Sequence, residues 1–232
     1  MSYEKDFEHF LSCTDEKKVI LKNVLETVKK RNVSSLLDIG AGDGSLSIPL
    51  SKEVDRYVAV EPSEVFAVKL EEKGLEVKRD SFPFEMEEKF DMILISHALP
   101  ERGYKEFLFS AWKLVKKGGC LMVVTYRDKE SEWVDLLKEI GEEHNELSQP
   151  DYREFLLYMQ ELGKTEKEED VSFVSAAATE DLFRALSFVF SEGDREKKER
   201  FSLHKSFLYN ILESRYKGGF PFRQFFIKLV DF

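Results

Sequence analysis

A strand that runs directly into a glycine-rich loop constrains the fold of this chain more than any other feature of its sequence. Residues 36–45 read LLDIGAGDGS, and the first of them are apolar enough to be buried on both faces of a sheet. Glycines at alternate positions let the backbone approach a ligand with no Cβ in the way. A buried strand followed by a glycine-rich loop is typical of open α/β sheets, which bind ligands at the carboxyl ends of their strands.

Short apolar runs alternate with helical patterns from this point onwards. Strands are expected over residues 35–39, 57–60, 75–78, 92–95 and 120–125. The clearest helix between them is expected over residues 104–117, with the pair Gly118 and Gly119 at its end. This alternation predicts a parallel sheet with helices on both faces.

Helices are expected on both sides of this region. At the N-terminus the apolar residues recur at helical spacing: Tyr3, Phe7, Phe10 and Leu11. A second helix is expected to run to about Lys30, with Thr14 as its cap. Further helices are expected around residues 133–140, 155–162, 182–190 and 207–216. The charged run 164–170 is expected to be a solvated loop, and residues 222–232 a final strand.

Composition narrows the class of partner. The chain has 232 residues, of which 42% are hydrophobic, and 35 basic against 45 acidic residues give a net charge of −10. This charge disfavours a nucleic-acid partner, because it repels a phosphate backbone. Cys13 and Cys120 form no zinc-binding cluster, which indicates a reducing compartment and no metal. No run is long and apolar enough for a membrane span, so we expect a cytoplasmic protein without a membrane partner.

The loop itself discriminates between classes of ligand. A dinucleotide-binding loop would need a third glycine where Ser45 stands, and a glycine occupies position 44 instead. Asp38 and Asp43 add negative charge, which would repel a pyrophosphate. A phosphate-free ligand with a cationic centre fits better, and the sulfonium of S-adenosylmethionine has that character. The alternative is that the glycines form only a tight turn.

Polar residues also follow the other expected strands. Glu61 ends the second strand, where one carboxylate can accept from both hydroxyls of a ribose. The alternative is a surface acid that precedes a helix capped by Ser63. Asp80 follows the third strand and could accept from an adenine amino group, or it could be an ordinary loop residue. Ser96 and His97 close the fourth strand, so all of these positions meet at one edge of the sheet.

Over residues 34–126 the sequence resembles the class I S-adenosylmethionine-dependent methyltransferases. The segments that carry the resemblance are LLDIGAGDGSLS, VAVEPS, VKRDSFPF, FDMILISHAL and WKLVKKGGCLMVVTY. It implies that Ser96 and His97 flank the transferring methyl group and that the other positions hold the cofactor. The expected cofactor-binding residues are Asp38, Gly40, Ala41, Gly42, Gly44, Glu61, Pro62, Ser63, Asp80, Ser81 and Ser96.

The resemblance and the strand pattern together predict one α/β domain. Its sheet is expected to be Rossmann-like, doubly wound, mostly parallel and seven-stranded, with N-terminal helices and a helical cap inserted after the fifth strand. The expected segments are N-terminal helices over residues 1–33, a cofactor-binding core over 34–126, the cap over 127–200, and a C-terminal helix and strand over 201–232.

A narrower resemblance joins this chain to the histamine N-methyltransferase-like enzymes. It rests on YEKDFEHFLSCTDEK, AVEPS, the helix of Trp133 and ATEDLFRAL. It implies an amine acceptor held by Glu16, whereas His97 stands where that family has a substrate-contacting Gln. Glu16 is equally well explained as an acid in the first turn of a helix, and His97 as a structural histidine.

Methyl transfer from a sulfonium is an in-line displacement that requires alignment and the exclusion of water. We expect Glu16 to bind the cationic part of an amine and His97 to take a proton. Aromatic residues are expected either to line the acceptor pocket or to pack in the core: Tyr3, Phe7, Phe10, Tyr126 and Trp133.

Several functions stay open at this point. The first is a small-molecule N-methyltransferase, the second a protein side-chain methyltransferase suited by its acidic surface to a basic target. The third is a non-catalytic, cofactor-binding regulatory subunit. The fourth strand is followed by no Pro-Pro-Tyr, Pro-Cys or Asp-Asp pair, which disfavours base methylation and magnesium-dependent catechol chemistry. The sequence leaves the oligomeric state open.

Overall fold

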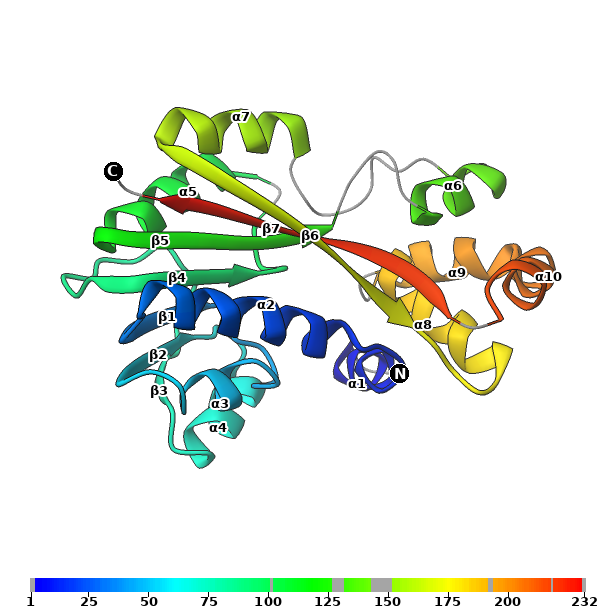
Figure 1. The fold of residues 1–232 in the computed structure, drawn as a ribbon. Helices are drawn as coiled ribbons and strands as arrows, with labels where there is room; N and C mark the ends of the chain where they lie inside the picture. Colours follow the sequence, from blue (N-terminus) through cyan, green and yellow to red (C-terminus); the bar gives the residue numbers. More distant parts are fainter. Residues whose placement is uncertain are drawn as a thin grey trace. The chain divides into compact units, whose positions relative to one another are not determined.

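A seven-stranded sheet with the order β3-β2-β1-β4-β5-β7-β6 organises the computed structural model of the chain (Figure 1). The structure describes residues 3–100, 102–126, 132–142, 152–191, 194–217 and 219–230. The strands are β1 (Ser35–Ile39), β2 (Arg56–Val60), β3 (Glu76–Lys78), β4 (Phe90–Ser96), β5 (Val115–Tyr126), β6 (Lys164–Val174) and β7 (Phe220–Val230). The helices are α1 (Tyr3–Cys13), α2 (Glu16–Arg31), α3 (Ser47–Leu50), α4 (Glu64–Glu72), α5 (Tyr104–Lys113), α6 (Glu132–Glu139), α7 (Tyr152–Leu162), α8 (Thr179–Ser191), α9 (Arg195–Leu203) and α10 (Lys205–Arg215).

The chain divides into two compact units. The first, called the sheet unit below, comprises Ile20–Arg127, Ser148–Glu169 and Gln224–Phe232. The second, called the helical unit, comprises Met1–Val19, Asp128–Leu147 and Asp170–Arg223. The expected division into four segments of a single domain stays a prediction.

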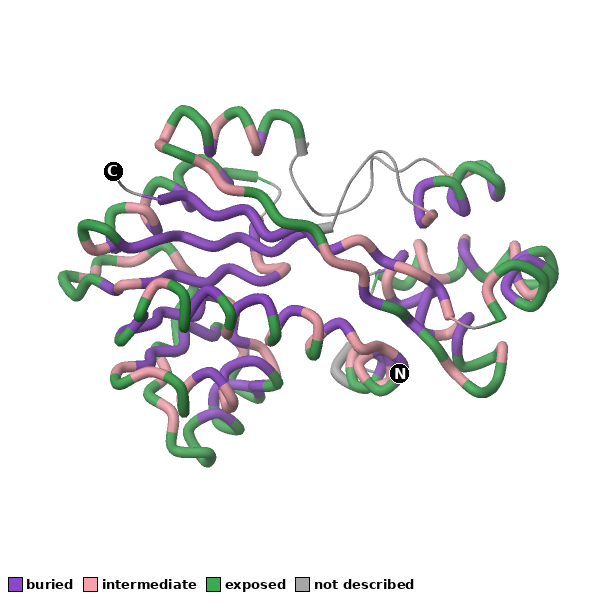
Figure 2. The backbone as a smooth tube through the Cα atoms, viewed as in Figure 1, coloured by how far each residue is buried: buried purple, intermediate pink, exposed green. Residues whose placement is uncertain are grey.

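The sheet has the predicted doubly wound, mostly parallel arrangement. β1 pairs in parallel with β2 and β4, β4 pairs in parallel with β5, and β7 runs antiparallel to β5. Every residue of β1 is buried, which requires both faces of the sheet to be covered. The tube in Figure 2 is coloured as buried along most of β4, β5 and β7 as well.

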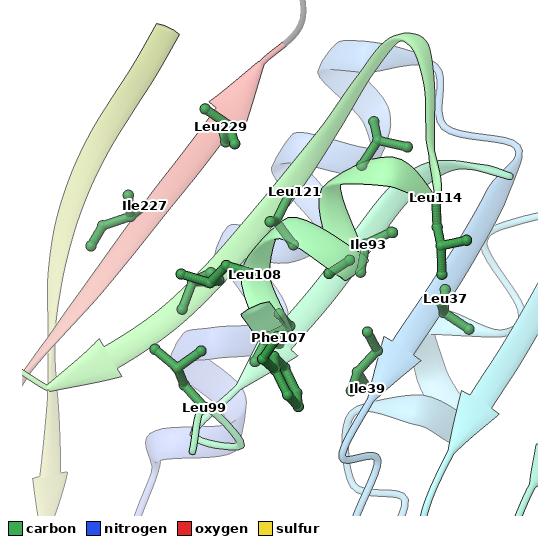
Figure 3. Close-up of a cluster of buried hydrophobic side chains, with 14 of the residues drawn as sticks. Leu37, Ile39, Ile93, Leu99, Phe107, Leu108, Leu114, Leu121, Ile227 and Leu229 are labelled. Atoms are coloured by element: carbon green, nitrogen blue, oxygen red, sulfur yellow. The ribbon is translucent and has the colours of Figure 1, made fainter. Parts of the chain in front are cut away.

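Apolar side chains of α5 and the sheet form the core of the sheet unit (Figure 3). Phe107 and Leu108 of α5 join Leu37 of β1 and Ile93 of β4 in one cluster, and β7 contributes Ile227 to it. Burying each such side chain contributes about 1.5 to 3 kcal/mol. The packing therefore fixes the strands whose ends carry the candidate site.

The helix predicted over residues 104–117 is too long. α5 ends at Lys113, and Val115 already pairs with Phe90 of β4. The carbonyl of Leu114 accepts a hydrogen bond from the backbone N–H of Phe90 at 2.8 Å. Both Leu114 and Val115 are buried, so the strand contact outweighs the helical periodicity there. The sheet register shifts between this pair and the next, and Gly118 has a φ of +79° in between.

The prediction of a solvated loop over residues 164–170 is wrong, because these residues begin β6. β6 lies at the edge of the sheet, where charged side chains are favoured because they discourage pairing with another chain. Its charged side chains have partners within the sheet unit. The carboxylate of Glu168 lies 2.8 Å from the amine of Lys228, and the carboxylate of Glu166 lies 3.2 Å from the guanidinium of Arg31. A charged edge strand has the composition of a loop, which explains the error.

The helical unit has an aromatic core. Phe188 of α8 lies 5.9 Å from Phe7 and 5.8 Å from Phe10 of α1, measured between ring centroids. Phe201 of α9 stacks on Phe183 and Phe190 of α8. The charged composition of α9 gives little helical periodicity, and the sequence did not predict this helix.

Within the described residues, no helix combines the length and apolar character needed to cross a membrane.

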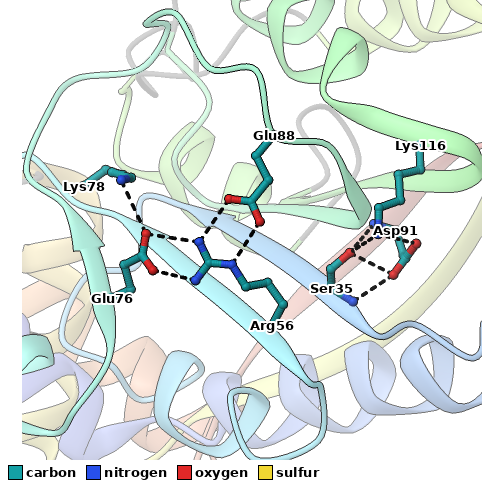
Figure 4. A network of polar contacts seen from close by, with 7 residues as sticks. All are labelled: Ser35, Arg56, Glu76, Lys78, Glu88, Asp91 and Lys116. Atoms are coloured by element: carbon teal, nitrogen blue, oxygen red, sulfur yellow. Dashed lines mark hydrogen bonds and ion pairs between the residues drawn. The ribbon is translucent and has the colours of Figure 1, made fainter.

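Charged side chains at the amino end of β4 join it to β1 (Figure 4). The carboxylate of Asp91 accepts from the backbone N–H and hydroxyl of Ser35, both at 2.8 Å, and lies 3.1 Å from the amine of Lys116. Burial opposes ionisation of Asp91, but the bonds from Ser35, Lys116 and Ser34 outweigh it and hold its pKa below the ordinary value. This carboxylate therefore stabilises the fold only while it is ionised.

We expect Asp91→Asn to lower the free energy of unfolding by about 1.5 to 3 kcal/mol at neutral pH, the range for hydrogen bonds to charged groups. Because the folded pKa is depressed, the carboxylate stabilises above the pKa of an unfolded Asp, about 3.9, and loses this effect as the pH falls through the folded pKa. Urea denaturation between pH 7 and pH 3 measures the difference. Asp55→Asn, at an exposed position, is the control. A difference that did not shrink with acid would contradict the role of the charge.

Candidate functional site

The polar residues predicted to bind the cofactor meet at the carboxyl ends of β1, β2 and β4, within the sheet unit. The loop that begins at Gly40 follows β1, Glu61 follows β2, and Ser96 is the last residue of β4. The strand register sets this arrangement, since Ile39 pairs with Val60 on one side and with Ile95 on the other. Parallel pairing thus brings together three segments that are distant in the sequence.

The three glycines of the loop all have positive φ, but they differ in what surrounds them. A Cβ at Gly40 would lie 2.3 Å from the Cβ of Ala98, and one at Gly44 would lie 2.8 Å from Leu70. A Cβ at Gly42 would meet no atom within 4 Å. Packing within the protein therefore explains why residues 40 and 44 are glycines. Gly42 instead faces open space that a ligand could fill, and its φ of +61° also suits a tight turn, so both interpretations stay open.

Glu61 fixes the loop from the neighbouring strand. Its Oε2 accepts from the backbone N–H of Gly42 at 2.8 Å, and its Oε1 accepts from that of Ser63 at 2.8 Å. The residue is 6% exposed, so it is not the surface acid of the alternative interpretation. Each carboxylate oxygen can accept a further hydrogen bond, which leaves capacity for hydroxyl groups of a ligand.

Asp38 supports the loop from inside the sheet. Its Oδ2 accepts from the hydroxyl of Ser47 at 2.7 Å and from that of Tyr57 at 2.5 Å. Burial, followed by the charge of Asp38 and its hydrogen bond, raises the pKa of Tyr57 well above its ordinary value, so Tyr57 remains a donor. Asp43 accepts from the backbone N–H and the hydroxyl of Ser45, which closes a tight turn. A direct contact of Asp38 with the cofactor stays a prediction.

The remaining predicted cofactor residues differ in exposure. Ala41 is buried, and its backbone N–H donates to the carbonyl of Val60 at 3.2 Å. Pro62, Asp80 and Ser81 are exposed, and Oδ1 of Asp80 accepts from the backbone N–H of Ser81 at 2.7 Å. These positions follow β2 and β3, as predicted, and their contacts with a cofactor stay predictions.

Two polar residues of the site, Ser96 and His97, lie at the end of β4. The hydroxyl of Ser96 is buried and has no hydrogen-bond partner among the described residues. His97 has a φ of +53°, in the left-handed region that few non-glycine residues adopt, and its backbone N–H donates to the carbonyl of Val124 at 3.1 Å. Its Nε2 lies 3.0 Å from Oε1 of Gln224 in β7.

Gln224 is a residue that the sequence interpretation missed. It is fully buried, and the residues that follow it, Phe225 to Ile227, are apolar. Burying an amide costs free energy unless the amide is hydrogen-bonded. A lone amide in an apolar strand was therefore a signal in the sequence, but only the fold could show that it meets His97.

Other predicted residues lie in the helical unit. Glu16 begins α2, is 3% exposed and lies 3.4 Å from the amine of Lys17. Its backbone N–H donates to the hydroxyl of Thr14 at 3.1 Å, but the carbonyl of Asp15 accepts from the N–H of Val19, so Asp15 and not Thr14 occupies the cap position of α2. Phe7 and Phe10 pack on Phe188 in the aromatic core. Roles of these residues toward an acceptor stay predictions.

The three remaining pocket candidates are Tyr3, Tyr126 and Trp133. Trp133 of α6 is 3% exposed and lies within 6.2 Å of the rings of Phe201, Phe220 and Phe222. The predictions for the side chains of Tyr3 and Tyr126 lie outside the described residues. Among the residues that the structure describes, no three His, Cys, Asp or Glu side chains group as metal ligands.

We expect Gly40→Ala to destabilise the fold more than Gly42→Ala. Both substitutions place a Cβ on a left-handed backbone, which costs about 1 to 2 kcal/mol. Only the first also forces a clash with Ala98, for which about 1 to 3 kcal/mol more is expected. Urea denaturation of the two variants measures this difference. Equal losses of stability would show that the loop does not pack on Ala98 as described.

Comparisons with known proteins identify a family and a fold. A family model described as a methyltransferase domain matches residues 8–188. The YcgJ protein from Bacillus subtilis is 15% identical, with a TM-score of 0.61, over 91% of this chain and 97% of that chain. The N-methyltransferase NodS from Bradyrhizobium japonicum WM9 is 15% identical, with a TM-score of 0.51, over 66% of this chain and 85% of its own. Coclaurine N-methyltransferase, bound to N-methylheliamine and SAH, is 16% identical, with a TM-score of 0.54, over 90% of this chain and 72% of its own.

Curated proteins include no match to this sequence. The solved structures share the fold with this chain, and the family match extends over more than half of its residues. The chain therefore belongs to the methyltransferase-domain family, and it is an S-adenosylmethionine-dependent methyltransferase.

Proposed function

We propose that this enzyme methylates the nitrogen of a small-molecule amine, with S-adenosylmethionine held by Glu61 and by the loop that begins at Gly40. The observation that carries the cofactor site is the hydrogen bond from the Gly42 backbone to Glu61 beside the open space at Gly42. The site offers a carboxylate and no cationic side chain among the predicted cofactor residues. Such a site suits a sulfonium cofactor that has no phosphate.

Glu61 is proposed to hold the ribose. Its two oxygens are oriented by the backbone of Gly42 and Ser63, so a pair of hydroxyls could donate to them without any rearrangement of the side chain. Asp80 and Ser81 would border the adenine, because they follow the neighbouring strand β3. The buried hydroxyl of Ser96 would then face the reacting end of the cofactor.

The bound cofactor supplies an electrophilic methyl carbon on a sulfonium. The residues of this chain would orient an acceptor nitrogen toward that carbon and exclude water from it. The nitrogen needs a free lone pair, so an ammonium must first give up a proton. His97, at the end of β4 beside Ser96, is proposed to take that proton, and Glu16 is proposed to bind a cationic part of the acceptor.

Two observations support an amine acceptor. Two of the structural neighbours, NodS and coclaurine N-methyltransferase, carry the name N-methyltransferase. The N-terminal segment and the ATEDLFRAL segment resemble the histamine N-methyltransferase-like enzymes. The aromatic residues of the helical unit, Phe7, Phe10 and Trp133, are proposed to contribute to the acceptor pocket, together with Tyr3 and Tyr126.

The thiols are not proposed to take part in this chemistry. Cys13 and Cys120 are both free and buried. Burial raises the pKa of Cys120 to about 11, so this thiol stays protonated at neutral pH and is a poor nucleophile. Unpaired cysteines suit a reducing compartment, and we propose that the protein works in the cytoplasm.

We expect Glu61→Ala to weaken the binding of S-adenosylmethionine by about 1.5 to 3 kcal/mol, the range for hydrogen bonds to a charged group. Titration calorimetry with S-adenosylmethionine and S-adenosylhomocysteine measures the loss. Glu61→Gln, which keeps one acceptor oxygen, is expected to lose less. Gly42→Val is expected to abolish binding with little loss of secondary structure, because its side chain would enter the open space. Unchanged affinity in Glu61→Ala would contradict the ribose assignment.

The acceptor is tested by transfer of a labelled methyl group. We expect label to appear on members of a panel of small primary and secondary amines, and Glu16→Gln to raise KM for the amine while the affinity for S-adenosylmethionine stays unchanged. A basic protein such as histone is the comparison substrate. Label on the protein alone would favour side-chain methylation. Intact cofactor binding without any transfer would favour a regulatory subunit and contradict the proposal.

A further inference from the structure

The backbone around His97 is held at two points, which leaves the imidazole ring as the variable part of this turn. The N–H of His97 donates to the carbonyl of Val124 in β5. The next residue, Ala98, packs directly on Gly40, where no Cβ can be accommodated. The left-handed φ of +53° at His97 accompanies these two contacts. These contacts hold the backbone of the turn, and side-chain torsions and protonation set the state of the ring.

Gln224 contacts the ring from a different strand. Its Oε1 lies 3.0 Å from Nε2 of His97, and the amide is fully buried in β7. An apolar side chain would be favoured at such a position if packing were its only role, because a buried amide is costly unless it is hydrogen-bonded. The amide is neutral, so it orients the imidazole without adding a charge beside it.

We propose that Gln224 is a positioning residue that selects one tautomer of His97. The amide oxygen accepts a hydrogen bond from Nε2–H, which keeps the proton of the neutral ring on Nε2 and makes Nδ1 its basic atom. Nδ1 is buried, so a proton reaches it from a group enclosed with it rather than from bulk water. In the proposed methyl transfer, on which this last step rests, that group is the ammonium of the acceptor. Nδ1 takes its proton and the ring becomes an imidazolium.

The tautomer can be observed without cofactor or acceptor. The chain has 4 histidines, so long-range 1H–15N NMR spectra of labelled protein contain few ring signals. His97→Asn identifies the signals of His97 by their loss, and Asn tolerates a left-handed backbone. Spectra are recorded at alkaline pH, where the ring is neutral. We expect the wild type to show one protonated and one bare ring nitrogen, with clearly separated 15N shifts.

Two variants of Gln224 test its role. In Gln224→Met, which keeps the length of the side chain but has no amide, we expect the two 15N shifts to approach each other as both tautomers become populated. In Gln224→Glu, where a carboxylate oxygen can accept from Nε2–H, we expect the separation to be restored. Ile227→Val, a buried change on the same strand, is the control and should leave the shifts unaltered. Shifts that stay fully separated in Gln224→Met would overturn the proposal, as would a collapse in Gln224→Glu at a pH where its His97 ring is neutral.

Kinetics distinguish this inference from the proposed function. With an amine that the wild type methylates, we expect Gln224→Met to lower kcat about 10- to 100-fold, within or below the usual contribution of a general base. KM for S-adenosylmethionine should stay unchanged, because Gln224 is not proposed to touch the cofactor. If the NMR shifts collapse and kcat is unaffected, Gln224 still positions His97, but the proton does not pass through Nδ1. That result would overturn the catalytic half of the inference and leave the cofactor site intact.

Discussion

The parallel pairing of β1 with β2 and β4 is the constraint on which the rest of the site depends. It aligns Ile39 with both Val60 and Ile95, so the residues just beyond these strands emerge together. The backbone N–H groups of Gly40 and Ala41 then donate to the carbonyl of Val60, which binds the loop to the neighbouring strand. Without this register, the glycines and Glu61 would be unrelated features of the sequence.

Buried polar contacts hold the loop on the aligned strands. Asp38 receives two hydroxyl groups inside the sheet, and Glu61 receives two backbone N–H groups at its edge. Both carboxylates are almost fully buried, where hydrogen bonds are stronger and an unpaired charge would be costly. The acids therefore have a structural role, and the same acidic character makes the loop unsuitable for a phosphate.

The sequence predicts the parts of this structure in which local pattern and packing agree. β1 was predicted with its observed bounds, and the positions of Glu61 and Ser96 followed from the strand pattern. It failed where a long-range contact overrides the local pattern. Val115 continues a helical stripe but pairs with Phe90, and the charged residues of β6 have the composition of a loop although they pair at a sheet edge. In the sequence, Gln224 is an amide that precedes an apolar stretch. Its partner is 127 residues away, and only the fold identifies it.

The unequal surroundings of the three glycines have a consequence for how this protein can change over evolutionary time. Gly40 and Gly44 are constrained by their own neighbours, so substitutions there are expected to cost stability whether or not a ligand is bound. Gly42 shares the left-handed backbone, but a Cβ there would meet no atom within 4 Å, so packing constrains it less. A single substitution at this position could therefore abolish activity and leave a folded protein. One mutation would then convert an enzyme into a non-catalytic protein of the same fold.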